Sequence, residues 1–179
     1  MVRFGATIGA IWGAALLVAC SPQGGAQNVA VQDTPPAPPT VAGGPTISAA
    51  GLRLIDVAIE SGARTHIFRT ELAATSEQQS KGMMFRTEMG DDEGMLFPSY
   101  EPQARSFWMK NTPLPLDIIF IGPDRRITNI EAGVPYSTDS VFSDGPALAV
   151  FEIRGGLAEE LEIGPGDRVV FDLPADAAP

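Results

Sequence analysis

The sequence is poor in the residues that most often carry catalysis. Cys20 is the only cysteine and His66 the only histidine among 179 residues. A chain with one cysteine forms no internal disulfide, and a structural zinc site built on thiolates needs several cysteines. Serine-hydrolase chemistry would have to use His66, and no nucleophile motif accompanies it. Glycine motifs for phosphates or dinucleotides are also absent. We therefore expect no cofactor, and we favour a binding protein over an enzyme.

Basic residues are scarce as well. The chain has 12 Lys and Arg against 22 Asp and Glu, which gives a formal net charge of -10 at pH 7. Nucleic acids and anionic membrane surfaces carry charge of the same sign, so they repel such a chain. We therefore expect no nucleic-acid partner.

The first twenty residues have the layout of an export signal. Arg3 precedes an uncharged apolar run that ends at Ala19 and is short for a membrane-spanning helix. The segment LVAC, ending at Cys20, resembles the lipobox of bacterial lipoproteins. That resemblance implies that residues 1–19 are a lipoprotein signal peptide and that Cys20 is diacylated after cleavage. An N-terminal membrane helix with an incidental cysteine is the alternative.

The residue after the cysteine bears on localisation. Ser21 stands there, and a residue other than aspartate resembles the outer-membrane sorting pattern of bacterial lipoproteins. We expect an exported protein that is attached to the cell envelope through its lipid on Cys20. In a host with two membranes, the expected location is the outer membrane, facing the periplasm.

A tether is expected between this anchor and a folded domain. Residues 20–51 consist mainly of Pro, Gly, Ala, Gln, Thr and Ser, and include TPPAPPT at 34–40. Such a composition buries too little apolar area to offset the entropy lost on folding, so we predict a disordered, partly extended linker. We predict a globular domain over residues 52–174 and a short tail over 175–179.

Short β-prone runs separated by turn residues fill this domain. The predicted strands are 52–60, 65–73, 94–100, 105–111, 116–122, 126–133, 147–153 and 168–173. The first two should form one hairpin, and 116–122 and 126–133 a second. Short helices are predicted over 75–82, from a capping-box pattern, and over 155–163. The pattern favours a mainly β, single compact antiparallel barrel or sandwich with two short helices, and a monomer.

Several motifs resemble the domain of unknown function 192 family. They are GMMFR at 82–86, GMLF at 94–97, FWMKNTPLPLDIIFI at 107–121, and FEIRGG with IGPGD between 151 and 167. The resemblance covers residues 53–173, and Met83 departs conservatively from the familiar GLM form of the first motif. It implies a compact, mostly β domain found in exported or lipid-anchored proteins. The resemblance does not indicate a particular biochemical activity.

The segment RSFWMKN suggests a binding site. Alternation along a strand would place Phe107 and Met109 on one face, and Trp108 and Lys110 on the other. A tryptophan beside an ammonium can stack against a sugar or aromatic ring. We therefore predict a small-molecule, glycan or protein ligand; the alternative is that Trp108 is covered as part of a minor core. The predicted ligand-binding residues are Trp108, Lys110, Asn111, Thr112, Asp117 and Arg86.

Two carboxylates stand in apolar strands. Asp117 opens LDIIFI, and Glu152 lies in ALAVFEI. A buried charge must be paired or hydrogen-bonded, so Asp117 could hold the turn at residues 111–112 or pair with Arg86 or Arg105. An ion pair with Arg86 is also the favoured role of Glu152. An envelope hydrolase is the alternative, and it requires Asp117 and Glu152 to face each other across one cleft.

Methionines are concentrated in one part of the domain. Five of the six lie between residues 83 and 109. Thioethers are good Cu(I) ligands, so a copper-binding protein using Met84 and Met89 is a further alternative. Methionine also fills gaps in small cores, and we therefore expect no metal site.

The lipobox gives the first testable prediction. Mass spectrometry of the membrane fraction should find a mature chain that begins at Cys20 and carries a diacylglyceryl group. Cys20→Ser removes the acylated thiol and should abolish that mass. An unprocessed chain beginning at Met1 in the cytoplasm of the native host would contradict both the lipidation and the expected location.

Overall fold

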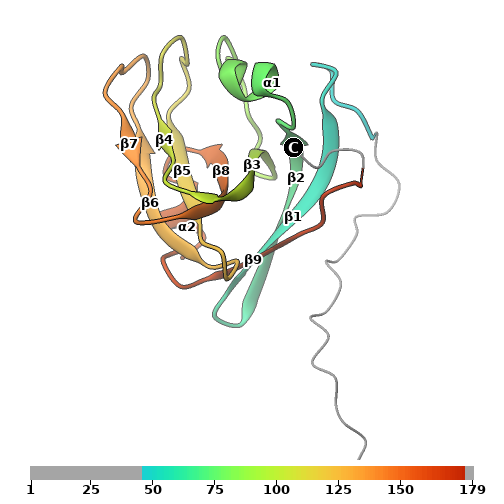
Figure 1. The fold of residues 1–179 in the computed structure, drawn as a ribbon, viewed down its shortest axis with the longest axis vertical. Coiled ribbons are helices and arrows are strands. Elements are labelled where there is room, and N and C mark those ends of the chain that lie inside the picture. The colour runs from blue at the N-terminus through green and yellow to red at the C-terminus, as the bar shows by residue number, and fades with distance from the viewer. Residues whose placement is uncertain (1–45, 176–179) are drawn as a thin grey trace, which may run out of the picture. The chain divides into compact units, whose positions relative to one another are not determined.

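The computed structural model describes residues 46–175. The predicted signal peptide, Cys20 and most of the predicted tether lie outside them. The described residues form nine strands and two short helices (Figure 1), which confirms the predicted mainly β class. The strands are β1 (Arg53–Ser61), β2 (Arg64–Leu72), β3 (Glu93–Gln103), β4 (Ser106–Phe107), β5 (Leu116–Ile121), β6 (Ile127–Gly133), β7 (Val141–Phe142), β8 (Ala147–Arg154) and β9 (Arg168–Phe171). The helices are α1 (Ser76–Lys81) and α2 (Leu157–Glu160), and within residues 46–175 no helix is long and apolar enough to cross a membrane.

Seven strands form one sheet in the order β6-β5-β8-β3-β2-β1-β9, and β4 pairs with β7 in a separate ribbon. We expected antiparallel pairing, but β2 and β3 are parallel. The connection that carries α1 runs between these two strands, and parallel neighbours need such a long crossover. The edge strands β6 and β9 do not pair along their length; an isolated bridge joins Arg168 of β9 to Arg126, the residue before β6. The fold is therefore sandwich-like and not a closed barrel.

Both predicted hairpins, β1–β2 and β5–β6, are present, and local signals account for the first of them and for α1. The β1–β2 turn uses Gly62 at φ 57°, a left-handed conformation that favours glycine. In α1, the Thr75 hydroxyl accepts a hydrogen bond from the Gln78 N–H, and the Gln78 side chain accepts one from the Thr75 N–H. This reciprocal capping box satisfies two N–H groups that a helix end leaves free.

Strand β8 separates two hydrophobic clusters. Its pairing with β5 puts Phe151 opposite Ile119, and Glu152 opposite Ile118. Because side chains alternate along a strand, the first pair faces one cluster and the second pair faces the other. The clusters have different covers. The larger one is built from the faces of the main sheet and α2, whereas the smaller one is covered by the chain after α1 and by the β4–β7 ribbon.

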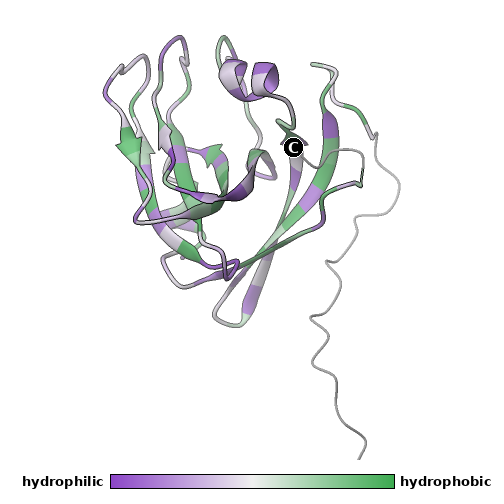
Figure 2. Cartoon of the chain, viewed as in Figure 1, coloured by the Kyte–Doolittle hydropathy of each residue, from purple (hydrophilic) through white to green (hydrophobic). Residues whose placement is uncertain are grey.

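Aromatic packing secures the ribbon over the smaller cluster. The Phe107 ring meets Phe97 edge to face at 5.0 Å between centroids, and Phe120 in the same manner at 6.3 Å. Figure 2 shows hydrophobic residues along the central strands and hydrophilic residues on α1. The ribbon thus carries the segment after Phe107 to the rim of this cluster.

Asp117 attaches α2 to the sheet. Its carboxylate oxygens accept hydrogen bonds from the Gly156 N–H at 2.9 Å and the Ala158 N–H at 2.8 Å. Neither the turn at residues 111–112 nor Arg86 or Arg105 supplies a partner, so the predicted partners of Asp117 were wrong. Both actual donors lie about forty residues further along the chain, where α2 begins. The carboxylate therefore has a structural role.

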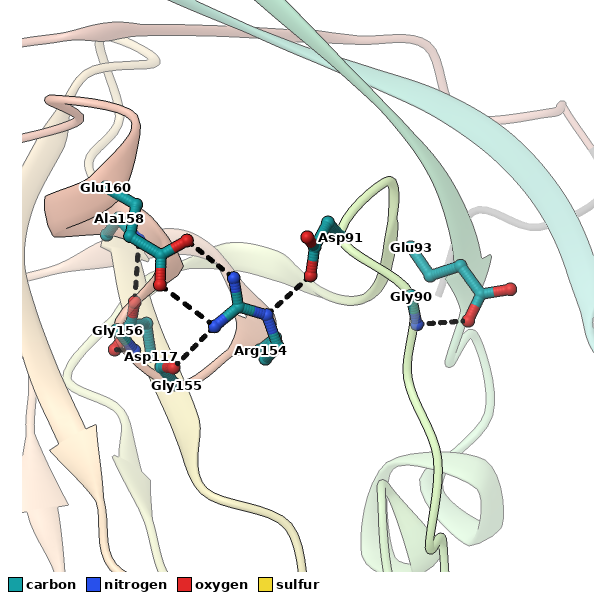
Figure 3. A network of polar contacts seen from close by, with 9 residues as sticks. All are labelled: Gly90, Asp91, Glu93, Asp117, Arg154, Gly155, Gly156, Ala158 and Glu160. Carbon is teal, nitrogen blue, oxygen red and sulfur yellow. Dashed lines mark hydrogen bonds and ion pairs between the residues drawn. The ribbon is translucent and has the colours of Figure 1, made fainter.

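Arg154 joins the same region to the segment before β3 (Figure 3). Its Nε donates to Asp91 at 2.5 Å, and its Nη2 donates to Glu160 at 2.7 Å. Hydrogen bonds from the guanidinium to Glu160 and then to Asp91 raise the Arg154 pKa above its ordinary value. Both carboxylates are exposed, so solvent screens these ion pairs and they add little to stability.

Replacing the Asp117 carboxylate should destabilise the domain. Asp117→Asn puts an amide group, itself a donor, before the Gly156 and Ala158 N–H groups, so at least one buried hydrogen bond is lost. We expect the free energy of unfolding to fall by about 1–3 kcal/mol, measured by urea denaturation. Asp139→Asn makes the same charge change at an exposed site and should stay within about 0.5 kcal/mol of the wild type. Equal stabilities of the two variants would contradict the role given to Asp117.

Candidate functional site

The segment predicted to bind a ligand leaves its strand early. Strand β4 ends at Phe107, and the following residues form the loop to β5. The orientation expected from alternation nevertheless holds, since Met109 is buried and Trp108 is 48% exposed. The Lys110 ammonium lies 5.1 Å from the centroid of the Trp108 ring, within cation–π range. Trp108 and Lys110 therefore form a partly exposed pair at the rim of the smaller cluster.

Three loops meet at this turn. The Phe85 N–H donates to the Asn111 carbonyl at 2.8 Å, and the Tyr136 N–H donates to the Thr112 carbonyl at 3.0 Å. Phe85, Asn111 and Tyr136 all have positive φ angles, of 64°, 57° and 61°. This left-handed conformation is costly for the bulky Phe85 and Tyr136, whereas asparagine adopts it more readily, and strained residues tend to cluster at functional sites. The loops are thus held in strained conformations around residues 108–112.

A small cavity opens between this turn and the end of α1. We call it the Trp108 pocket; its volume is about 40 Å³. One wall is formed by the end of α1 and the residues that follow, and the other by aromatic residues and the 108–112 turn. Its lining residues are 79–84, Phe97, Phe107, Trp108, Thr112 and Glu152. The cavity holds a group of a few atoms and is too small for a sugar ring.

Glu152 is the distinctive group of this pocket. The residue is 4% exposed, and its Oε2 atom has no hydrogen-bond partner within the described part of the chain. Its neighbours across β3 and β5 are Met95 and Ile118, which offer no polar group. Burial in these surroundings raises the pKa of Glu152 to about 8. The carboxyl group is therefore mostly protonated at neutral pH and can both donate and accept a hydrogen bond.

Asp117 and Glu152 do not share a cleft. Asp117 lies opposite Ile153 in the β5–β8 pairing, one register position from Glu152, so the two carboxyl groups project from opposite faces of the sheet. Asp117 is also occupied by the N–H groups of α2. A hydrolase that uses both carboxylates across one cleft is incompatible with this arrangement.

Arg86 lies in a second, larger pocket instead of beside Trp108. Its Nη2 donates to Glu71 at 2.5 Å, so the expected pairing of Arg86 with Glu152 was wrong. This cavity, of about 500 Å³, borders β1, β2 and the segment before β3. The predicted site is thus divided between two pockets: Trp108 and Thr112 line the smaller, Arg86 the larger, and Asp117 neither.

The two methionines proposed for copper are divided in the same way. Met84 lines the Trp108 pocket, and Met89 lines the larger pocket. Among the described residues, no group of three or more His, Cys, Asp and Glu side chains is placed to hold a metal ion. Met84 and Met89 therefore do not line one common site, as the copper hypothesis requires.

Sequence reasoning missed the contribution of α1. The residues at the end of this helix form a wall of the Trp108 pocket. The sequence analysis also treated Glu152 only as a catalytic or ion-paired group, and not as an unpaired group that lines a pocket. The sequence signal was a single carboxylate among the apolar residues of β8. Whether this carboxylate is ion-paired depends on the position of the basic residues in the fold, which the sequence does not give.

Comparisons with known proteins agree with this fold. The model of the family DUF192, described as "Uncharacterized ACR", matches residues 57–171. Among curated proteins, none matches the chain. A crystal structure of a protein of unknown function from Novosphingobium aromaticivorans is 50% identical, with a TM-score of 0.69, and the match covers 72% of this chain and 93% of that one.

A second crystal structure is also similar. It is described as a "putative transcription regulator" from Sinorhizobium meliloti, is 38% identical, and has a TM-score of 0.65. The match covers 67% of this chain and 95% of that one. Because the family model spans β1 to β9 and these relatives share the fold over nearly their whole length, this chain belongs to the DUF192 family.

Proposed function

We propose that this protein is an exported, lipid-anchored protein of the cell envelope whose DUF192 domain binds a ligand at the Trp108 pocket. The observation that carries the binding proposal is the buried Glu152 carboxyl group, which has an unpartnered oxygen in a pocket beside a half-exposed tryptophan. The location rests on the lipobox at Cys20 and on the Pro-rich segment that would hold the domain away from the membrane.

The energetics of Glu152 favour an incoming polar group. A buried polar atom without a hydrogen bond costs about 1–3 kcal/mol, and a ligand that bonds to Oε2 recovers this cost. The pocket of about 40 Å³ admits only the tip of a ligand. The rest must lie outside, where Trp108 and Lys110 are accessible.

A sugar hydroxyl group meets these requirements. It is small, and it both donates and accepts, as the protonated Glu152 carboxyl does. It is also attached to a ring whose C–H face can pack against an indole. Lys110 already lies over the Trp108 ring, so the sugar ring either displaces this ammonium or uses the ring surface that remains exposed. We therefore favour a glycan-like ligand.

A partner protein is the second candidate. The loops around the pocket expose large apolar side chains: Phe85 is 71% exposed, Val134 62% and Tyr136 64%. Aromatic residues such as Phe85 and Tyr136 are enriched at protein–protein contacts. A protein that places a hydroxyl-bearing side chain against Glu152 would use the same chemistry as a sugar.

Trp108→Ala should abolish ligand binding while the domain stays folded. We suggest titrating the chain from residue 20 onward, with Cys20→Ser to avoid lipidation, against chitotriose and maltotriose by NMR. We expect shifts of the Trp108 indole N–H and loss of binding in the variant. The unfolding free energy should fall by well under the roughly 3–5 kcal/mol of a buried tryptophan.

Tyr100→Ala is the matched control, because Tyr100 is 80% exposed and lines neither pocket. It should leave binding unchanged. No saccharide binding to the wild-type chain would exclude the glycan-like ligand, and a large loss of stability in Trp108→Ala would identify Trp108 as a core residue.

Glu152 should make stability fall as pH rises. The folded state keeps its proton up to a pKa of about 8, whereas the unfolded chain releases it near 4.5. Between these values the folded state binds more protons, so its stability decreases with rising pH. We expect the Tm to decrease between about pH 5 and pH 8, measured by calorimetry.

Glu152→Gln has no proton to lose and should flatten this part of the Tm profile. Glu101→Gln, at an exposed site, should keep the wild-type slope. The same slope in Glu152→Gln as in the wild type would contradict the protonated state assigned to Glu152.

A further inference from the structure

The larger cavity has the dimensions of a ligand site in its own right. We call it the Met89 pocket; its volume of about 500 Å³ lies within the range of small-molecule sites. One side is the face of the β1–β2 hairpin that points away from the larger cluster, where Leu54 lies opposite Glu71, and Ile67 opposite Ala58. The other side is formed by the segment 83–94, and residues 47–49 complete the lining.

The interior of the Met89 pocket is largely apolar. Leu54, Ile67, Met83 and Met89 supply aliphatic and thioether surface. Methionine side chains are flexible and polarizable, and they adapt to ligands of different shape. This lining suits a ligand with an apolar body.

The two arginines of the pocket are already neutralised. The Arg69 guanidinium lies 3.0 Å from the Asp56 carboxylate, and that of Arg86 lies 2.5 Å from Glu71. Both carboxylate side chains are nearly buried, at 9% and 11% exposure. Moving either arginine to an anionic ligand would break its ion pair with a nearly buried carboxylate, which is costly.

The remaining charges at the rim are negative. Glu88, Asp92 and Glu93 line the pocket and are exposed. Glu93 accepts a hydrogen bond from the Gly90 N–H, whereas the structure gives the carboxylates of Glu88 and Asp92 no hydrogen-bond or ion-pair partner among residues 46–175. Three carboxylates at the entrance attract a cation and repel an anion.

We infer that the Met89 pocket binds an amine with an apolar body: the body enters between the β1–β2 hairpin and residues 83–94, and the ammonium group remains at the Glu88–Asp92 rim. The pocket contains neither Trp108 nor Glu152, and only Met83 lines both cavities. This site is therefore separate from the proposed glycan-like site, and either can exist without the other.

Three probes that share one chain and differ in head group test the inference: octylamine, octan-1-ol and octanoate. At pH 7 the first is cationic, the second neutral and the third anionic. The protein is the Cys20→Ser chain from residue 20 onward, and binding is measured by two-dimensional NMR titration. We expect octylamine to bind most tightly, about tenfold more tightly than octanoate, with shifts concentrated at Leu54, Ile67 and Met89.

Two double variants with equal charge changes separate the rim from the overall field. Glu88→Gln with Asp92→Asn should weaken octylamine binding by about five- to tenfold and leave octan-1-ol unchanged. The control combines Glu77→Gln with Glu101→Gln, two exposed positions outside the pocket. It should leave the affinities for octylamine and octan-1-ol unchanged. Equal or tighter binding of octanoate would overturn the cationic specificity. Shifts absent from the pocket residues, or equal weakening by both double variants, would overturn the site.

Discussion

The register of β8 between β3 and β5 is the constraint on which the two sides of this domain depend. Six of the eight residues of β8 are buried, on one face or the other. This register points Phe151 into the larger cluster and Glu152 toward the smaller one. A shift of one residue would exchange the two faces and put the carboxyl group into the larger core. The apolar contacts that fix the register of β8 therefore also fix the position of Glu152. The carboxyl group stays buried because leaving the pocket would require this register to change.

The smaller cluster also supports loops that would be unfavourable alone. A bulky residue in the left-handed region costs about 1–2 kcal/mol, and Phe85 and Tyr136 both adopt it beside the 108–112 turn. Backbone hydrogen bonds between these loops and the packing of Met83 and Met109 below them offset that cost. The exposed aromatic side chains consequently belong to an ordered surface, and an ordered surface loses less entropy on binding than a flexible one.

The sequence predicted the features that depend on near neighbours. Both hairpins and the capping box of Thr75 and Gln78 follow from residues only a few positions apart. The parallel pairing of β2 with β3 does not, since it depends on the path of the chain between them. The wrong partners predicted for Arg86 and Asp117 have the same cause, because these contacts also depend on the path of the chain. The chain after α1 brings Arg86 to Glu71 on β2, away from Glu152. Asp117 accepts its hydrogen bonds at the start of α2. The exposure of Trp108 and the burial of Met109 agree with the alternation expected for a strand, although β4 ends at Phe107.

The pairing of β1 with β9 joins the beginning and the end of the folded domain. Val57 lies opposite Phe171, and Glu60 opposite Arg168, so the sheet gains its last strand only when the C-terminal part of the domain has been synthesised. A chain that stops before Arg168 exposes the backbone of β1 as a free edge, which is able to pair with another chain. Proteolytic trimming from the C-terminus would thus do more than shorten this protein: it would turn a covered strand into a template for aggregation.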